Sequence, residues 1–142
     1  MTIRPMREAD VAGCAAIVRG AFEDVRAGAC LGLVAEDAGR VVGFVVYTPA
    51  GTFVHSGYVR SVAVAPDAQH QGIGGRLMDA AEAAILERGP NVFLLVSNWN
   101  TGAQRFYERR GYRRIGEVPD YVRRGITEVL YRKTLGPIQR DA

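Results

Sequence analysis

The chain has 142 residues, which is enough for one domain with a hydrophobic core and too few for two ordinary domains. Hydrophobic residues make up 48% and charged residues 23%, as in ordinary globular proteins. The net charge of +3 suits the binding of a polyanionic small molecule and is too small to indicate nucleic acid by itself. We expect one domain over residues 1–135 and a C-terminal tail over residues 136–142.

Several classes of protein are disfavoured by short-range features. No apolar run is long enough to cross a bilayer, and residues 1–6 lack the apolar core of a signal peptide, so we expect a cytoplasmic protein without membrane contact. The two cysteines and two histidines (Cys14, Cys30, His55 and His70) have no metal-ligand spacing. We therefore expect no metal site and no disulfide.

Periodicity and turn signals divide the chain into alternating strands and helices. Strands are predicted at residues 2–4, 31–36, 40–48, 58–64, 91–97, 112–118 and 126–134. Helices are predicted at residues 8–21, 73–88 and 101–110, with a short extra helix within 22–30, and residues 49–57 are predicted as a loop. The order βααβββαβαββ predicts an α/β fold in which helices cover both faces of a mixed sheet.

Glycines stand where the strand at 58–64 gives way to the helix at 73–88. They are Gly72, Gly74 and Gly75, and they follow a β-prone run that stops at Pro66. The first N–H groups of a helix have no partner inside the helix, and the helix dipole favours negative charge there. Without side chains in the way, these N–H groups can close on a phosphate or pyrophosphate. The alternative is a glycine-rich turn that merely starts a helix.

Two common phosphate-binding loops do not fit this stretch. A P-loop needs Gly-Lys-Ser/Thr, but Gly74 is followed by Gly75 and Arg76. A dinucleotide fingerprint needs a third glycine where this chain has Leu77. Gln69, Gly72 and Gly74 instead fill the pattern Gln/Arg-x-x-Gly-x-Gly/Ala, and the stretch resembles the acyl-CoA loop of the GNAT superfamily of N-acetyltransferases.

A second motif follows at the next strand and helix. It resembles the GNAT segment Val-x-x-x-Asn-x-x-Ala-x-x-x-Tyr-x-x-x-Gly-Phe/Tyr, which is filled here by Val96, Asn100, Ala103, Tyr107, Gly111 and Tyr112. Asn100 and Tyr107 are two helical turns apart and share one face. The alternative is that Tyr107 is a core aromatic residue, together with Phe106, and that Asn100 is a helix cap.

The resemblance implies a GNAT-like, mostly antiparallel sheet and acetyl-CoA as co-substrate. It assigns acetyl-CoA binding to the backbone of a splayed strand end, to the cradle and to one asparagine: Val62, Ala63, Val64, His70, Gln71, Gly72, Ile73, Gly74, Gly75, Arg76 and Asn100. It places Tyr107 at the thiol end, where a phenol with a pKa of about 10 is protonated and can donate to the departing sulfur. The implied reaction is transfer of an acetyl group to a primary amine by direct attack.

The base that deprotonates the amine is left open. GNAT enzymes that acetylate ribosomal-protein N-termini carry a Glu where this chain has Leu95, which argues against the same peptide mechanism. Candidates are Tyr58, His55, Asp120 and Tyr121, and water is an alternative to all of them. A small amine is the favoured acceptor.

Other interpretations of the function stay open at this stage. One is a protein or peptide amine acetyltransferase, and another is an acyl-CoA-binding sensor or interaction module without catalysis. A run of arginines is interpreted as a solvated surface rather than a site for the 3′-phosphate of the cofactor or for an acidic or nucleic-acid acceptor: Arg105, Arg109, Arg110, Arg113, Arg114, Arg123 and Arg124. A monomer and a homodimer are equally consistent with the sequence.

Overall fold

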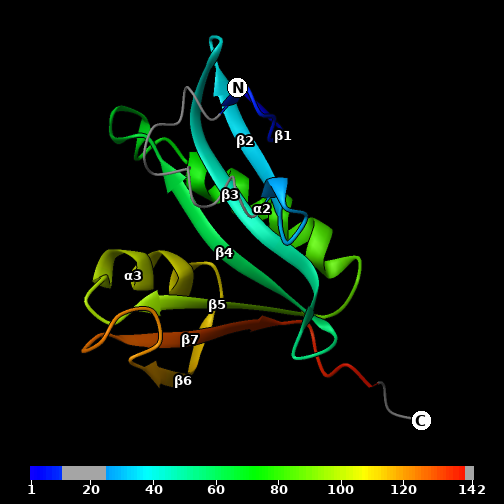
Figure 1. Ribbon diagram of the computed structural model, residues 1–142, viewed down its shortest axis with the longest axis vertical. Helices are drawn as coiled ribbons and strands as arrows, with labels where there is room; N and C mark the ends of the chain where they lie inside the picture. Colours follow the sequence, from blue (N-terminus) through cyan, green and yellow to red (C-terminus); the bar gives the residue numbers. More distant parts are fainter. Residues whose placement is uncertain (11–24, 140–142) are drawn as a thin grey trace.

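The computed structural model describes residues 1–10 and 25–139, and Figure 1 shows their arrangement. The strands are β1 (Thr2–Pro5), β2 (Leu31–Asp37), β3 (Arg40–Thr52), β4 (Ser56–Val64), β5 (Asn91–Ser97), β6 (Arg113–Pro119) and β7 (Thr127–Thr134). The helices are the 3-10 helix η1 (Pro66–Ala68), α2 (Ile73–Leu86) and α3 (Thr101–Arg109).

The seven strands form one sheet in the order β1-β2-β3-β4-β5-β7-β6. Neighbouring strands are antiparallel except β4 and β5, which are parallel. This confirms the expected mixed, mostly antiparallel sheet. The helix predicted at residues 8–21 lies almost wholly outside the described residues, and of the segment 22–30 the described Val25 and Arg26 are helical.

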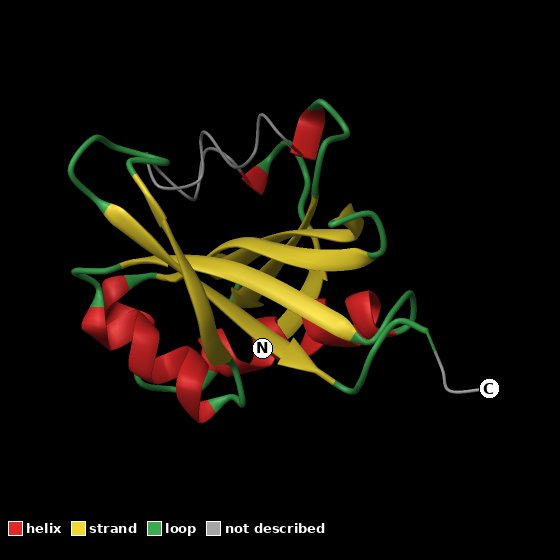
Figure 2. Cartoon of the chain, turned by 90° about the horizontal axis from the view of Figure 1, so that it is seen from below, coloured by secondary structure: helices red, strands yellow, loops and turns green. Residues whose placement is uncertain are grey.

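One face of the sheet, here called the helix face, carries α2 and α3 (Figure 2). Alternate residues of β5 and β7 point to it, and their side chains join those of both helices in one buried cluster that includes Leu77, Ile85, Leu94, Tyr107 and Tyr131. A smaller cluster with Cys30, Val34, Phe44 and Val46 lies on the opposite face. The core therefore sits mainly between the sheet and the two helices.

The prediction of a loop at residues 49–57 is wrong. β3 continues to Thr52 and β4 starts at Ser56, and these two residues are partners in a tight hairpin. Pro49 and Gly51 suggested a loop because proline cannot donate to a ladder. The structure accommodates Pro49 at an irregularity, since the pairing register jumps between Thr48 and Thr52.

Candidate active site

The site begins where β4 and β5 separate. They pair only at Gly57–Val92, Tyr58–Phe93 and Val59–Leu94, although β4 runs on to Val64 and β5 to Ser97. Beyond the third pair the two strands diverge, as Figure 1 shows. The splay that the family resemblance implied is therefore present in the structure.

The diverging end of β4 presents backbone groups to this gap. Ala65 N–H donates to Val42 C=O across the β3–β4 ladder at 2.8 Å. In an antiparallel pair, successive residues alternate between the two edges of the strand, so the N–H groups of Val62 and Val64 point away from β3 and into the gap. Ala63 N–H points toward β3 instead. Of the three residues assigned to this strand end, two offer amides to a ligand.

The N-terminus of α2 forms the cradle. Gly72 is the N-cap with φ 76°, and Arg76 N–H donates to Gly72 C=O at 3.1 Å in the first bond of the helix. The N–H groups of Ile73, Gly74 and Gly75 therefore have no partner within the helix. The side chain of Ile73 is buried in the core and anchors this turn.

The cradle and the gap are continuous. A Cβ atom built on Gly74 would lie 3.6 Å from the ring of Phe106 and 3.7 Å from the side chain of Val64. Gln69 ties the same turn to β4, since its Nε2 donates to Val64 C=O at 3.2 Å. His70, Gln71 and Arg76 are exposed beside the cradle.

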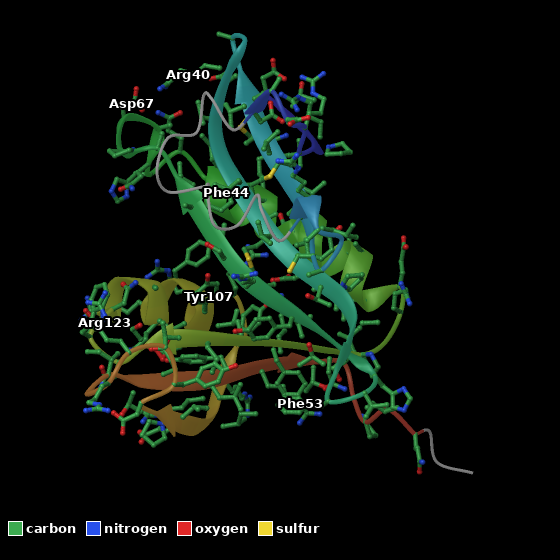
Figure 3. All side chains as sticks on the ribbon, viewed as in Figure 1. Arg40, Phe44, Phe53, Asp67, Tyr107 and Arg123 are labelled. Atoms are coloured by element: carbon green, nitrogen blue, oxygen red, sulfur yellow. The ribbon has the colours of Figure 1, made fainter. Side chains whose placement is uncertain are left out.

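Tyr107 lies on α3 at the side that faces the gap (Figure 3). Its side chain is 7% exposed, and its ring packs edge-on against Phe106 at 5.1 Å and Tyr112 at 5.7 Å between centroids. Burial raises the pKa of Tyr107 to about 12, with opposing contributions from the charge of Arg110, which lowers it, and from Tyr58, which raises it. The phenol is therefore a protonated donor at neutral pH.

Asn100 is the N-cap of α3. Its Oδ1 accepts a hydrogen bond from Ala103 N–H at 3.1 Å, so the helix-cap interpretation is correct. The cap uses the side-chain oxygen only. The Nδ2 amide can still donate to a ligand, and the two roles are compatible.

A pocket of about 390 Å³ opens on the face of the sheet opposite to the helix face, next to the paired segments of β4 and β5. Its walls come from the β3–β4 hairpin, from the central strands β5 and β7, and from β6 with the turn after it: Thr52, Phe53, Tyr58, Phe93, Leu95, Val118, Tyr121 and Leu130. Figure 3 shows Phe53 at the hairpin, beside the end of β7. The pocket brings together two of the four residues considered as bases.

The other two candidate bases are held elsewhere. His55 lines a separate groove with Arg88 and Pro90 at the far end of the hairpin. Asp120 Oδ1 accepts from Gly125 N–H at 2.7 Å within the β6–β7 turn. Tyr58 remains in the pocket, and burial followed by the nearby Tyr121 and Glu128 raises its pKa to about 12.

Glu128 is a residue that sequence reasoning missed. Its side chain is 6% exposed on β7, and its Oε2 accepts a hydrogen bond from Ser97 Oγ at 2.7 Å. The available signal was an acidic residue inside a β-prone run, where the following Val129, Leu130 and Tyr131 are apolar. A carboxyl group inside such a strand is costly unless it has a partner or a function.

The arginine run does not form one uniform surface. Arg110 is drawn inward, where its Nη2 contacts Asp79 Oδ1 at 2.6 Å and Glu82 Oε1 at 3.2 Å. Arg114 is paired with Glu117 on the exposed side of β6. These two arginines thus have protein partners, and the cluster is not a ready phosphate site as a whole.

Comparison with known proteins identifies the family. The model of the acetyltransferase (GNAT) family matches residues 6–112, so the chain belongs to this family. This confirms the resemblance inferred from the two motifs. In the part of the chain that the structure describes, no helix is long and apolar enough to cross a membrane. No group of three His, Cys, Asp or Glu among the same residues could hold a metal ion.

Individual relatives differ in the compounds named for them. A blasticidin-S acetyltransferase from Streptomyces morookaense is 40% identical over 68 residues, which is 48% of this chain and 49% of that protein's length. Chaetomium thermophilum Naa20, solved in complex with a bisubstrate analogue, is 25% identical with a TM-score of 0.77, over 94% of this chain and 86% of that one. An aminoglycoside 6'-N-acetyltransferase complexed with coenzyme A is 16% identical with a TM-score of 0.76 and shares the fold over 99% of this chain and 100% of that one.

Proposed function

We propose that this protein transfers the acetyl group of acetyl-CoA to a primary amine. The observation that carries the proposal is the grouping of three features: the α2 cradle, which lies beside Val64 and Phe106, the diverging end of β4, and the buried Tyr107 on α3. An anion-binding helix end, free strand amides and a protonated phenol are the groups that a thioester of a phosphorylated carrier requires.

The residues present fit acetyl-CoA. The amides of Ile73, Gly74 and Gly75 would hold the pyrophosphate, since they lack partners within the helix and lie at its positive end. His70, Gln71, Gly72 and Arg76 complete the cradle, with Arg76 as an exposed cation for a phosphate. Along the pantetheine arm, we assign hydrogen bonds to the β4 edge and to Asn100 Nδ2.

The chemical step follows from the same groups. Bound acetyl-CoA supplies an activated acetyl group. The amides of Val62 and Val64 stabilise negative charge that develops on its carbonyl oxygen. The amine nitrogen bonds to the carbonyl carbon, the carbon–sulfur bond breaks, and Tyr107 gives its proton to the sulfur. The amine loses one proton to solvent, and Tyr107 regains one, which balances the reaction.

The test is release of the CoA thiol from acetyl-CoA in the presence of a panel of amines. Tyr107→Phe is expected to lower kcat by about 100-fold, as for loss of a general acid, while acetyl-CoA binds as in the wild type. Tyr131→Phe is the matched control, because Tyr131 is also a buried tyrosine of the helix-face cluster and its hydroxyl contacts Glu108. Equal rates in Tyr107→Phe and Tyr131→Phe would contradict the role of Tyr107.

The acceptor proposed here is a small amine. Leu95 replaces the acidic residue of ribosomal-protein acetyltransferases and instead lines the apolar pocket. Tight acetyl-CoA binding without turnover of any amine would favour the alternative function, an acyl-CoA-binding sensor or interaction module without catalysis. A single domain over residues 1–135, the cytoplasmic location and the monomeric or homodimeric state remain predictions.

A further inference from the structure

The pocket on the opposite face is separated from the helix face by the sheet itself. On β5, Leu94 and Val96 are buried in the helix-face cluster, so the alternate residues Phe93, Leu95 and Ser97 point the other way. On β7, Val129 and Tyr131 are in the helix-face cluster, so Glu128 and Leu130 point to the same side of the sheet as the pocket. An acceptor in the pocket would thus approach the gap from the face opposite to α2 and α3.

The walls of this pocket are flat and mostly apolar. Four aromatic rings line it, and Phe53 meets Phe93 edge-on with centroids 4.9 Å apart and an interplanar angle of 80°. None of its lining residues carries a permanent charge; its polar lining groups are the hydroxyls of Thr52, Tyr58 and Tyr121. Aromatic walls of this kind favour an unsaturated ring, which can stack or meet them edge-on.

Glu128 is not one of the residues that line the pocket; it is buried next to the pocket, on the side nearer to the gap. In the ladder Leu130 pairs with Leu95, and Glu128 is one row further, between Ser97 on β5 and Val118 on β6. One such row, two residues along a strand, is about 7 Å. Ser97 Oγ donates a hydrogen bond to Oε2 of Glu128, and Oε1 of Glu128 takes no part in that bond.

In the described part of the chain, the donor bonded to the carboxyl group of Glu128 is Ser97, and two arginines on the same side of the sheet make contacts with other residues. Arg132 is on the same side of β7, but its Nε donates to Asn91 Oδ1 at 2.8 Å, at the far end of the strand. Arg60 on β4 donates to Cys30 Sγ at 3.9 Å in the second cluster. A buried carboxyl group is stabilised by a cation that can hydrogen-bond to it.

We propose that the pocket binds an acceptor with a flat ring between Phe53, Tyr58, Phe93 and Tyr121, and that Glu128 binds its ammonium group. The bound ammonium group gives one proton to solvent before the attack, and the resulting neutral amine then reacts as described above. The acceptor class is a primary amine on a short arm from one aromatic or heteroaromatic ring. This inference rests on the proposed acetyl transfer and names its substrate class. Long polyamines and amino sugars carry several cations and no flat ring, and they match neither the walls nor the single carboxyl group.

The direct test compares two ligands of matched shape, 2-phenylethylamine and 2-phenylethanol. Their binding is measured by calorimetry with CoA present. Wild type is expected to bind the amine at least about tenfold more tightly than the alcohol, since only the amine forms a charged hydrogen bond. Glu128→Gln is expected to abolish this difference. The control Glu117→Gln, an exposed β6 carboxylate paired with Arg114, should preserve it.

A second variant examines the ring site without touching the core. Tyr121 is 66% exposed, so Tyr121→Ala should fold normally and weaken both ligands by about tenfold. Val122→Ala, in the same turn and outside the pocket, is the matched control. Equal affinities of wild type for amine and alcohol, a preserved difference in Glu128→Gln, or no binding of either ligand would overturn the inference.

Turnover separates this inference from the proposed function. The ring amine should have a kcat/KM at least about tenfold above that of 2-cyclohexylethylamine, spermidine, an aminoglycoside or an alanine-initiated tripeptide. Preferred acetylation of one of those four would overturn the substrate class and leave the transferase standing. Glu128-dependent binding of the ring amine without acetylation of any amine would support the pocket and contradict the transferase.

Discussion

Tyr107 can act as a proton donor because its ring is buried and its hydroxyl has no acceptor among the described side chains. The ring is enclosed by Phe106 and Tyr112, and no side chain in the described part of the chain accepts a hydrogen bond from its hydroxyl. The proton is therefore held tightly but is not committed to a structural partner. At neutral pH such a group stays protonated, so it can donate a hydrogen bond or its proton to the sulfur as the carbon–sulfur bond breaks, and it then recovers its proton from solvent.

The raised pKa of Tyr107 predicts a loss of stability at alkaline pH. A tyrosine with a pKa of about 12 when folded and about 10 when unfolded contributes stability that is complete below pH 10 and lost as the pH rises to 12. At pH 11 the loss is about 1.4 kcal/mol. Urea unfolding at pH 8 and pH 11 should therefore show a smaller loss for Tyr107→Phe than for wild type. Equal losses would contradict this pKa.

Glu82 is a second buried carboxylate, and its role is structural. It accepts hydrogen bonds from the Tyr112 hydroxyl at 2.9 Å and from Lys133 Nζ at 2.8 Å, and it contacts Arg110. Glu82→Ala leaves these partners without a carboxylate and should lower the free energy of unfolding by about 3–5 kcal/mol. Asp79→Asn, which alters only the exposed partner of Arg110, should cost less than about 1 kcal/mol. Similar losses in urea unfolding would refute the difference between the two sites.

At the scale of elements, the N-terminus of α2 depends on one left-handed residue. Gly72 has φ 76°, and a Cβ there would have no atom of the described residues within 4 Å apart from its chain neighbours. Gly39, in the β2–β3 turn, has φ 78° and equally open surroundings. Alanine at either position should cost about 1 kcal/mol in unfolding experiments, because both backbones are strained for a residue with a side chain.

Only Gly72→Ala is expected to affect the ligand. Its added methyl group stands at the cradle, so CoA affinity should fall at least severalfold, whereas Gly39→Ala should bind CoA as the wild type does. Calorimetric titration with CoA measures both. A loss of CoA affinity of the same size in Gly39→Ala would show that general destabilisation, rather than the cradle, is responsible.

Elements with a strong local signal were predictable from the sequence. The strand at Asn91–Ser97 matches its prediction, and the helix at Thr101–Arg109 is one residue shorter than predicted. The hairpin at residues 49–57 was not predictable, because Pro49 and Gly51 are local loop signals that pairing between β3 and β4 overrides. Local sequence signals therefore predicted the helices and strands better than they predicted the connections between them.

The same limit applies to the site. The cradle and Tyr107 belong to contiguous motifs, and the structure brings both to one gap. The pocket and Glu128 were missed because they depend on register: Ser97, Glu128 and Val118 become neighbours only when β5, β7 and β6 pair as they do. Cross-strand register is a property of the assembled sheet and is not written in any one segment.

At the scale of the whole molecule, the sheet consists of two parts joined by a short seam. Strands β1 to β4 form one part and β5 to β7 the other, and the seam has three paired positions on each strand. α2 packs on strands of both parts, and its residue Glu82 joins it to Lys133 of β7. A ligand seated in the gap would contact the edge of β4 and the start of α3 at once.

Binding of CoA should therefore slow amide hydrogen exchange at the free edge of β4. The amides of Val62 and Val64 point into the gap, so peptides covering this end of β4 and the cradle at residues 72–75 should gain protection when CoA is added. Peptides from β1, β2 and β6 lie away from the gap and serve as internal controls. Protection confined to the cradle would show that the β4 amides do not bind the pantetheine arm. Protection of both segments would establish that one ligand contacts the cradle and the free edge of β4 together, and added protection at the start of α3 would show that it also spans the seam.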